Sequence, residues 1–177
     1  MPAMAERFET FDDLGNPAGL VERDVVHATG LWHKSAHVFL FNSGDELYVQ
    51  RRAADKDLYP GLWDFSVGEH LKPGETFLAG ALRGLQEELG VSGVALTPIR
   101  GVRRAAYRVA ELGVLDRELQ QAFRGRHDGP VAPDPAEVAA VEAVALEELA
   151  GWIRRAPGDF TPWFLSDLQS LELLPIG

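Results

Sequence analysis

The chain contains no cysteine. A disulfide, a thiolate metal site and a cysteine nucleophile are therefore all excluded. The chain also lacks any apolar run near the ~20 residues that a membrane-spanning helix needs. Its first segment, Met1 to Thr10, holds two acidic side chains and no apolar stretch of the kind found in secretory signals. The sequence therefore predicts a cytoplasmic protein without membrane contact.

Basic residues are scarce as well. The chain has 17 Lys and Arg against 27 Asp and Glu, which gives a formal net charge of −10. Such a surface repels a nucleic-acid backbone, so no nucleic-acid partner is expected. An anionic small molecule would need local help from metal ions or from a few Arg and Lys side chains.

Length and composition fit one folded domain. The 177 residues are 46% hydrophobic and 25% charged, as in ordinary globular proteins. No internal repeat or low-complexity tract is visible. We expect a single domain over residues 1–177, with an N-terminal edge segment at about 1–33.

Strand and helix patterns are interspersed along the chain. The segment 35–42 has apolar residues in alternation and predicts a buried strand, with 46–51 as its hairpin partner. Further strands are expected at 64–67, 94–100, 102–109, 117–124 and 137–146, although the Ala-rich last segment also allows a helix, and a short edge hairpin at 11–20. Helices are expected at 76–89, 147–155 and 163–173. This order predicts an α+β fold or α-β-α sandwich, a mixed sheet flanked by helices.

The helix at 76–89 carries the clearest local signals. Leu78, Leu82, Leu85 and Leu89 recur at spacings typical of one apolar helix face. Thr76 suits the N-cap, and a glycine follows at position 90, where helices commonly end.

Acidic residues gather on this helix and on the loop before it. Glu87 and Glu88 are adjacent, Glu75 lies at the loop exit, and Arg83 is four residues before Glu87, where it can form an ion pair. Carboxylates at 75, 87 and 88 would offer the oxygen ligands that Mg²⁺ or Mn²⁺ prefers. The alternative is a solvated acidic helix face with a salt bridge.

The spacing of these residues resembles the Nudix box. That pattern is a Gly, five residues, a Glu, seven residues, Arg-Glu, an apolar residue, any residue, Glu-Glu, any residue, Gly and an apolar residue. Placing Glu75 on the first Glu puts Arg83 on the Arg and Glu87-Glu88 on the pair, without a gap. The box then covers 68–91. The resemblance implies a Nudix fold, Glu87, Glu88 and Arg83 as catalytic residues, and a metal held by the glutamates.

Two positions depart from the box. Glu69 stands at its first Gly, and Gly84 stands where the family has a metal-binding Glu. One explanation is that Gly80 and Gly84, both costly inside a helix, let another element approach closely. A sharper hypothesis is that Glu69 supplies the missing carboxylate from the loop side.

The surrounding segments resemble the branch of the family near isopentenyl-diphosphate isomerase. The stretches "HATGLWHKSAHVFLFN", "QRRAADKDLYPGLWDFSVGEH" and "DFTPWF" carry this resemblance over roughly residues 14–170. It implies that His70 is a metal ligand, and that it joins a second metal site with His27, His33, Asp116 and Glu118. The catalytic Cys of the isomerase falls on Gly68, which argues against isomerase activity. The alternative is that these histidines are ordinary polar residues satisfied by hydrogen bonds.

Arg51, Arg52 and Lys56 precede the box. In an acidic protein such a cluster suits a phosphate clamp, because Arg offers bidentate contacts. The alternative is a solvated charge run paired with Asp55 or Asp57.

Together these features predict a hydrolase that uses Mg²⁺ or Mn²⁺ to cleave a small diphosphate compound, such as a nucleoside diphosphate derivative. A Nudix domain that has lost hydrolysis and only binds its ligand is the second reading, and an isomerase-like enzyme is the third. Neither the substrate nor the catalytic base follows from the sequence. A homodimer is the expectation from the family.

Overall fold

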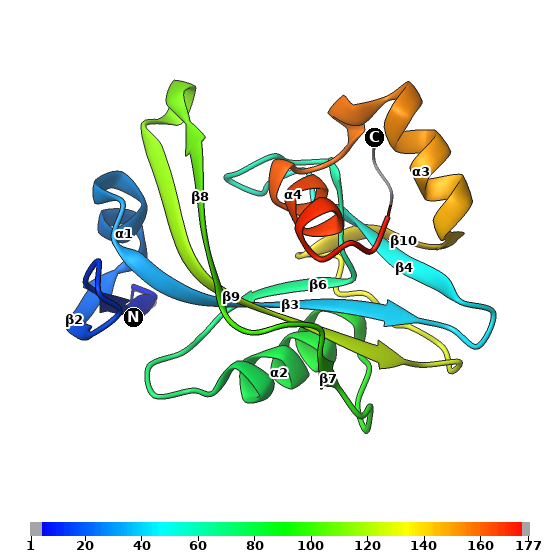
Figure 1. Ribbon diagram of the computed structural model, residues 1–177, viewed down its shortest axis with the longest axis horizontal. Coiled ribbons are helices and arrows are strands. Elements are labelled where there is room, and N and C mark those ends of the chain that lie inside the picture. The colour runs from blue at the N-terminus through cyan, green and yellow to red at the C-terminus, as the bar shows by residue number, and fades with distance from the viewer. Residues whose placement is uncertain (1–4, 175–177) are drawn as a thin grey trace.

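Strand β3 (Trp32–Phe41) lies at the centre of the fold. The computed structural model describes residues 5–174 and places helices on both faces of a mixed sheet (Figure 1). The strands besides β3 are β1 (Arg7–Phe11), β2 (Pro17–Glu22), β4 (Glu46–Arg52), β5 (Trp63–Asp64), β6 (Val67–His70), β7 (Thr97–Pro98), β8 (Arg103–Val109), β9 (Val114–Arg126) and β10 (Val138–Ala145). The helices are α1 (Arg23–Thr29), α2 (Phe77–Leu89), α3 (Leu146–Arg155) and α4 (Pro162–Ser170), with 3₁₀ turns η1 (Ala110–Leu112) and η2 (Pro157–Asp159). The predicted mixed sheet flanked by helices is confirmed.

Apolar side chains alternate between the two faces of β3, and this explains why the sheet has a core and helices on each face. Ala36, Val38 and Leu40 are buried in a core with Leu85 and Leu89 of α2. Residues of the opposite parity, including Phe39 and Phe41, are buried with residues of α3 and α4. Because successive strand side chains point to opposite faces, one strand supplies both cores.

Three of the strands that pair with β3 place polar residues beside its beginning. β9 runs parallel to it, with His33 opposite Glu118 and Ser35 opposite Gln120. β6 runs antiparallel to it, with Ser35 opposite His70. β1 also pairs with β3, at the first two residues of β3, Trp32 and His33. Polar residues at the beginning of β3 therefore lie between those of β6 and β9.

The N-terminal segment forms the expected edge hairpin, β1 and β2, and then a helix that the sequence pattern did not predict. Helix α1 is seven residues long and has no side-chain hydrogen bond at its N-cap. It ends at Gly30 with a φ of 68°, a left-handed conformation that favours glycine. The helix places His27 and Arg23 beside the sheet.

Helix α2 begins and ends as predicted, but its buried face differs from the predicted one. The Thr76 hydroxyl accepts from the Ala79 N–H, and Gly90 ends the helix with a φ of 64°. Leu85 and Leu89 are buried, whereas Leu78 and Leu82 are 44% and 38% exposed. The predicted leucine stripe is therefore wrong in its first half, because smaller residues of α2 face the sheet there.

Other boundaries also differ. The strand expected at 64–67 is two short strands, β5 and β6, and the strand expected at 94–100 is ordered as a strand only at β7. The segment 137–146 is a strand and not a helix, and the last helix covers Pro162–Ser170, shorter than the expected 163–173. Among the residues from 5 to 174, no helix is long and apolar enough to cross a membrane.

Candidate active site

Arg83 connects the carboxylates of the loop and helix. Its Nε and Nη2 donate to the two oxygens of Glu75, each at 2.9 Å. Its Nη1 lies 3.1 Å from Glu87 and 3.2 Å from Glu69. Its Nη2 also donates to the His70 carbonyl oxygen, at 2.9 Å. A single guanidinium therefore fixes the loop against the helix, a use to which its planar fork of donors is suited.

Glu69 occupies the space left by Gly84. A Cβ at position 84 would lie 3.1 Å from the Glu69 Cβ and 2.7 Å from Val67 Cγ1. Gly80 is similarly close to Leu71 of the adjoining loop, at 3.1 Å. The helical glycines therefore let α2 approach β6 closely, and the Cβ and Cγ of Glu69 pack against the helix at Gly84. That Glu69 supplies the missing carboxylate from the loop side remains a hypothesis.

Glu88 is the most strongly perturbed carboxyl of the box. It is 8% exposed, and its Oε2 accepts from Gln50 Nε2 at 2.7 Å. Burial raises the pKa of Glu88 to about 8, because desolvation disfavours the ionised form. Burial also raises the pKa of Glu69, although Arg83 opposes this.

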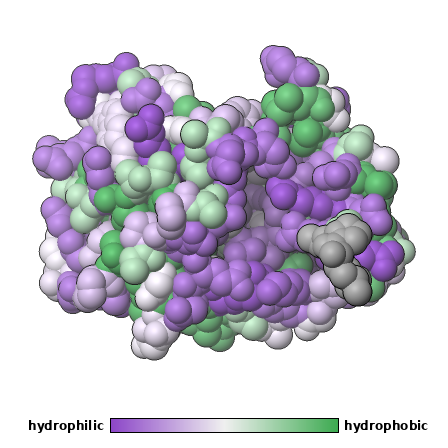
Figure 2. Space-filling model, turned by 180° about the vertical axis from the view of Figure 1, so that it is seen from behind, coloured by the Kyte–Doolittle hydropathy of each residue, from purple (hydrophilic) through white to green (hydrophobic). Residues whose placement is uncertain are grey.

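An outer cavity of about 1120 Å³, open to solvent, joins the box to the loop before it. Its cations come from α1, β4 and its following loop, and the box: Arg23, Arg52, Lys56, Lys72 and Arg83. Its carboxylates are Glu6, Glu69, Glu87, Glu88, Asp134 and Glu137. Figure 2 shows the surface hollowed near its middle, with mainly hydrophilic residues around the hollow. A cavity with both charge signs suits an anion bound together with a metal cation.

Two of the three residues of the predicted phosphate clamp line the outer cavity, and the third does not. Arg52 and Lys56 line the outer cavity, and Lys56 contacts Glu137. Arg51 is exposed, donates to the Gly61 carbonyl oxygen and lines neither this cavity nor the pocket beside it. Glu75 is likewise held by Arg83 outside the cavity lining.

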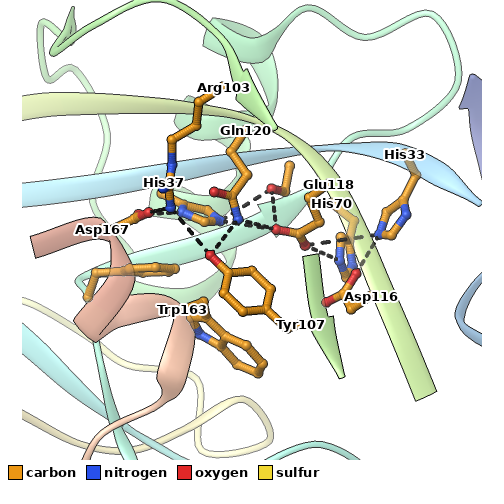
Figure 3. A network of polar contacts seen from close by, with 12 residues as sticks. His33, His37, His70, Arg103, Tyr107, Asp116, Glu118, Gln120, Trp163 and Asp167 are labelled. Atoms are coloured by element: carbon orange, nitrogen blue, oxygen red, sulfur yellow. Dashed lines mark hydrogen bonds and ion pairs between the residues drawn. The ribbon is translucent and has the colours of Figure 1, made fainter. Parts of the chain in front are cut away.

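A cluster of three histidines and one aspartate lies next to the box. The ligand atoms of His27, His33, His70 and Asp116 all lie within 4.8 Å of one another. Glu118 adjoins them, with Oε1 3.2 Å from His70 Nε2 and 4.0 Å from His33 Nε2 (Figure 3). Ligands around one divalent ion at ~2.0–2.2 Å lie about 3–4 Å apart, so the spacing fits a single ion. We call these five residues the cation cluster.

Unpaired atoms point into the cation cluster. His27 Nε2, His33 Nε2 and Asp116 Oδ1 are buried and lack a hydrogen-bond partner among residues 5–174. Buried polar atoms of this kind call for an explanation, and a bound ion supplies one. His33 Nδ1 faces the Leu31 carbonyl oxygen at 3.1 Å. Since a carbonyl only accepts, Nδ1 carries a proton, as in histidines that bind a metal through Nε2.

The pKa values show how the cluster attracts positive charge. Burial lowers the pKa of His27 to about 4, which keeps a lone pair free for a cation at neutral pH. Burial also acts to lower the pKa of His33, but Asp116 and Glu118 outweigh it and raise that pKa. Burial acts to raise the pKa of Glu118, but His37 and His70 hold it well below its usual range. The residues present therefore fit a divalent cation.

Comparison with known proteins assigns the family. The model of the NUDIX domain matches residues 31–164. The chain belongs to the Nudix family. It is 35% identical to an isopentenyl-diphosphate Delta-isomerase of Burkholderia multivorans, over 91% of this chain and 90% of that protein. It is 34% identical to an uncharacterized Nudix hydrolase of Rhodococcus erythropolis, over 86% and 84%. The crystal structure of DR0079 from Deinococcus radiodurans shares the fold, with a TM-score of 0.67, 22% identity and coverage of 85% and 90%.

The Nudix chain differs from the isomerase pattern at Gly68. A Cβ at this position would lie 2.5 Å from Phe65 Cε2. Phe65 itself stacks on His37, with ring centroids 4.3 Å apart. The space that a side chain at position 68 would need is therefore filled by an aromatic ring. Beside it is an inner pocket of about 480 Å³, whose lining includes Phe65, His37 and Trp163.

Sequence reasoning missed two groups of this Nudix site. Arg23 lines both the inner pocket and the outer cavity and pairs with Asp57 at 3.0 Å. It lies in α1, whose N-terminus carries no capping residue that would have revealed the helix. His37 and Asp167 form a buried pair, with Nδ1 2.6 Å from Oδ2. They are far apart in sequence, and only the alternation of β3, which placed His37 with Phe39 and Phe41, indicated its face.

Proposed function

We propose that the protein is a metal-dependent hydrolase of a small diphosphate compound. The observation that carries this proposal is the outer cavity, where cationic side chains and the box carboxylates Glu69, Glu87 and Glu88 face the same space. A diphosphate carries several negative charges, and the cations lining the cavity are matched by carboxylates. Binding therefore needs an added divalent cation, for which Mg²⁺ or Mn²⁺ is the natural choice with oxygen ligands.

The residues that line the cavity and the pocket have different roles in the proposed reaction. Arg23, Arg52 and Lys56 contact the phosphates from one side of the cavity. Arg83 holds Glu69 and Glu87 in place, so that both carboxylates would be available to bind a divalent cation. Bound cations would neutralise the diphosphate and lower the pKa of an attacking water. The group attached to the diphosphate enters the inner pocket, past Trp163.

Glu88 couples cation binding to proton release. Its carboxyl is protonated at neutral pH, because burial raises its pKa to about 8. A cation requires the ionised form, so binding releases this proton. Cation affinity is therefore expected to rise with pH up to about 8.

An isomerase-like activity is the second candidate, because the cation cluster is formed and the relatives include named isomerases. Two observations oppose it. The chain has no cysteine, and Phe65 fills the space that a side chain at position 68 would need.

The test is turnover of a panel of diphosphates with Mg²⁺, with Mn²⁺ and with a chelator. The panel includes nucleoside diphosphates and triphosphates, sugar nucleotides, dinucleotides and isoprenoid diphosphates, with products identified by mass. The double variant Glu87→Gln/Glu88→Gln should abolish turnover. Arg52→Gln should raise KM, whereas Arg100→Gln, at an exposed position paired with Glu172, should not.

The outcomes of this assay distinguish a hydrolase, a binding module and an isomerase-like enzyme. Metal-dependent phosphate release that is lost in the double variant supports the hydrolase. Ligand binding without turnover would refute hydrolysis and favour a binding module. Conversion of isopentenyl to dimethylallyl diphosphate without phosphate release would favour the isomerase-like enzyme.

A further inference from the structure

Glu118 has two oxygens in different surroundings. Oε1 faces the cation cluster, 3.2 Å from His70 Nε2. Oε2 is turned the other way, where it accepts from Ser35 Oγ at 2.9 Å and from Gln120 Nε2. The carboxylate is 5% exposed, so water does not compete for these contacts. Its orientation is set by the groups that hold Oε2.

Ser35 is in turn held by His37. His37 Nε2 lies 3.2 Å from Ser35 Oγ and 3.7 Å from Glu118 Oε2, and its Nδ1 lies 2.6 Å from Asp167 Oδ2. Asp167 comes from α4 and also contacts Arg103. Figure 3 shows these groups as one connected network that leads from α4 to the cation cluster.

The donors and acceptors of this network can be assigned from chemistry alone. A hydroxyl has one proton, and Ser35 gives it to the Glu118 carboxylate, so its oxygen accepts from His37 Nε2. The carboxylate of Asp167, beside Arg103, accepts from Nδ1. Both nitrogens of His37 are donors, and the hydrogen-bond directions all run toward the two carboxylates. The Ser35 hydroxyl therefore cannot turn away from Glu118.

We propose that Ser35 and His37, anchored by Asp167, are positioning residues that hold Glu118 with Oε1 presented to a divalent cation in the cluster. This inference rests on the proposed metal-dependent function. The pair's place in the fold supports it: the register sets His37 opposite Gly68 on β6, and Ser35 opposite His70. The two residues therefore lie directly behind the cluster and do not line it with free ligand atoms.

The test measures cation binding by the full chain without substrate. Metal-free protein is titrated with MnCl₂ and free Mn²⁺ is followed by electron paramagnetic resonance. Binding that is lost in His33→Ala is assigned to the cluster. Groups that orient metal ligands typically contribute ~10–100-fold to affinity, so Ser35→Ala and His37→Gln should weaken this binding by about that factor. The absorption spectrum of bound Co²⁺ should also change, because one oxygen ligand is no longer fixed.

Ser66→Ala is the matched control. Ser66 is fully buried in the bend between β5 and β6, and among residues 5–174 its hydroxyl hydrogen-bonds only to the Tyr48 carbonyl oxygen and the Leu40 N–H. It should keep the affinity and the Co²⁺ spectrum of the wild type. A general loss of packing would affect both serine variants, whereas loss of the Glu118 contact affects only Ser35→Ala.

Two results would overturn the inference. If Ser35→Ala melts cooperatively and binds Mn²⁺ with unchanged affinity and an unchanged Co²⁺ spectrum, Ser35 does not position Glu118. This holds even if His37→Gln fails to fold, since Ser35→Ala leaves the His37–Asp167 contact in place. If the wild type itself shows no His33-dependent binding, the cation cluster holds no ion and the inference is refuted, whereas the box site of the proposed hydrolase is judged separately by the turnover panel.

Discussion

Replacing Glu88 by Gln tests the electrostatics of the box directly. Glu88 is buried, and burial raises the pKa of its carboxyl from 4.5 to about 8. The folded protein therefore keeps a proton at pH values where the unfolded chain has lost it. By linkage, the protonated carboxyl stabilises the fold fully below about pH 4.5, and this contribution is lost progressively as the pH rises to about 8. Glutamine keeps the neutral shape and removes this dependence.

The magnitude follows from the width of this window. Each pH unit inside it changes the free energy of unfolding by about 1.4 kcal/mol. Between about pH 5 and pH 7 the wild type should therefore lose about 2–3 kcal/mol relative to Glu88→Gln. The wild type has to be compared with Glu88→Gln, because other groups also titrate in this range. Burial lowers the pKa of His27 to about 4, so His27 makes the free energy of unfolding rise with pH over part of the range. Its contribution is common to both and cancels.

The assay is urea denaturation in the presence of a chelator at several pH values across this range. Glu87→Gln is the matched control, because Glu87 is the neighbouring residue and its side chain is half-exposed, at 52%. The control should keep the pH dependence of the wild type. If Glu88→Gln keeps it too, Glu88 is ionised in the folded protein, and the description of this carboxyl as a buried acid is wrong.

Three further predictions concern the box and its neighbourhood. Arg83→Gln should destabilise the fold by about 1–3 kcal/mol, since it leaves partly buried carboxylates unpaired, and should lower kcat/KM; denaturation and steady-state kinetics measure the two effects. Gly84→Ala should destabilise by about 1–3 kcal/mol in a urea titration despite the better helix propensity of alanine, because its Cβ would lie 2.7 Å from Val67 Cγ1. Gly68→Cys should be destabilised to a similar extent in the same titration, because its Cβ would lie 2.5 Å from Phe65 Cε2, and it should give no conversion of isopentenyl diphosphate.

Local signals predicted much of the fold. Thr76 and Gly90 set the ends of α2, because a hydroxyl cap and a left-handed glycine act on neighbouring residues only. Alternation along 35–42 predicted β3, and the sheet flanked by helices follows from the order of such elements. Helix α1 was missed because it is short and has no side-chain hydrogen bond at its N-cap, so its own sequence gives only a weak helix signal.

The buried face of α2 shows where periodicity is insufficient. The leucines suggested one face, but Gly80, Ala81 and Gly84 are buried and Leu78 and Leu82 are exposed. Small residues permit close approach of backbones, and this cannot be recognised until the neighbouring strand is in place. The same limit applies to the candidate site. The box spacing indicated Glu87 and Arg83, whereas the His37–Asp167 contact joins residues that only the folded sheet and α4 bring together.

The chain departs from the family patterns at Gly84 and at Gly68, and in both places a neighbouring side chain fills the space beside the glycine. At Gly84 the missing side chain is replaced in space by Glu69, and at Gly68 it is replaced by the ring of Phe65. In each case a side chain added at the glycine alone would clash with the neighbouring residue. The consequences differ, because Glu69 is itself a carboxylate facing the box, whereas a phenyl ring cannot transfer a proton. The first exchange therefore leaves a carboxylate beside the box helix, and the second leaves an aromatic ring where a side chain at position 68 would lie.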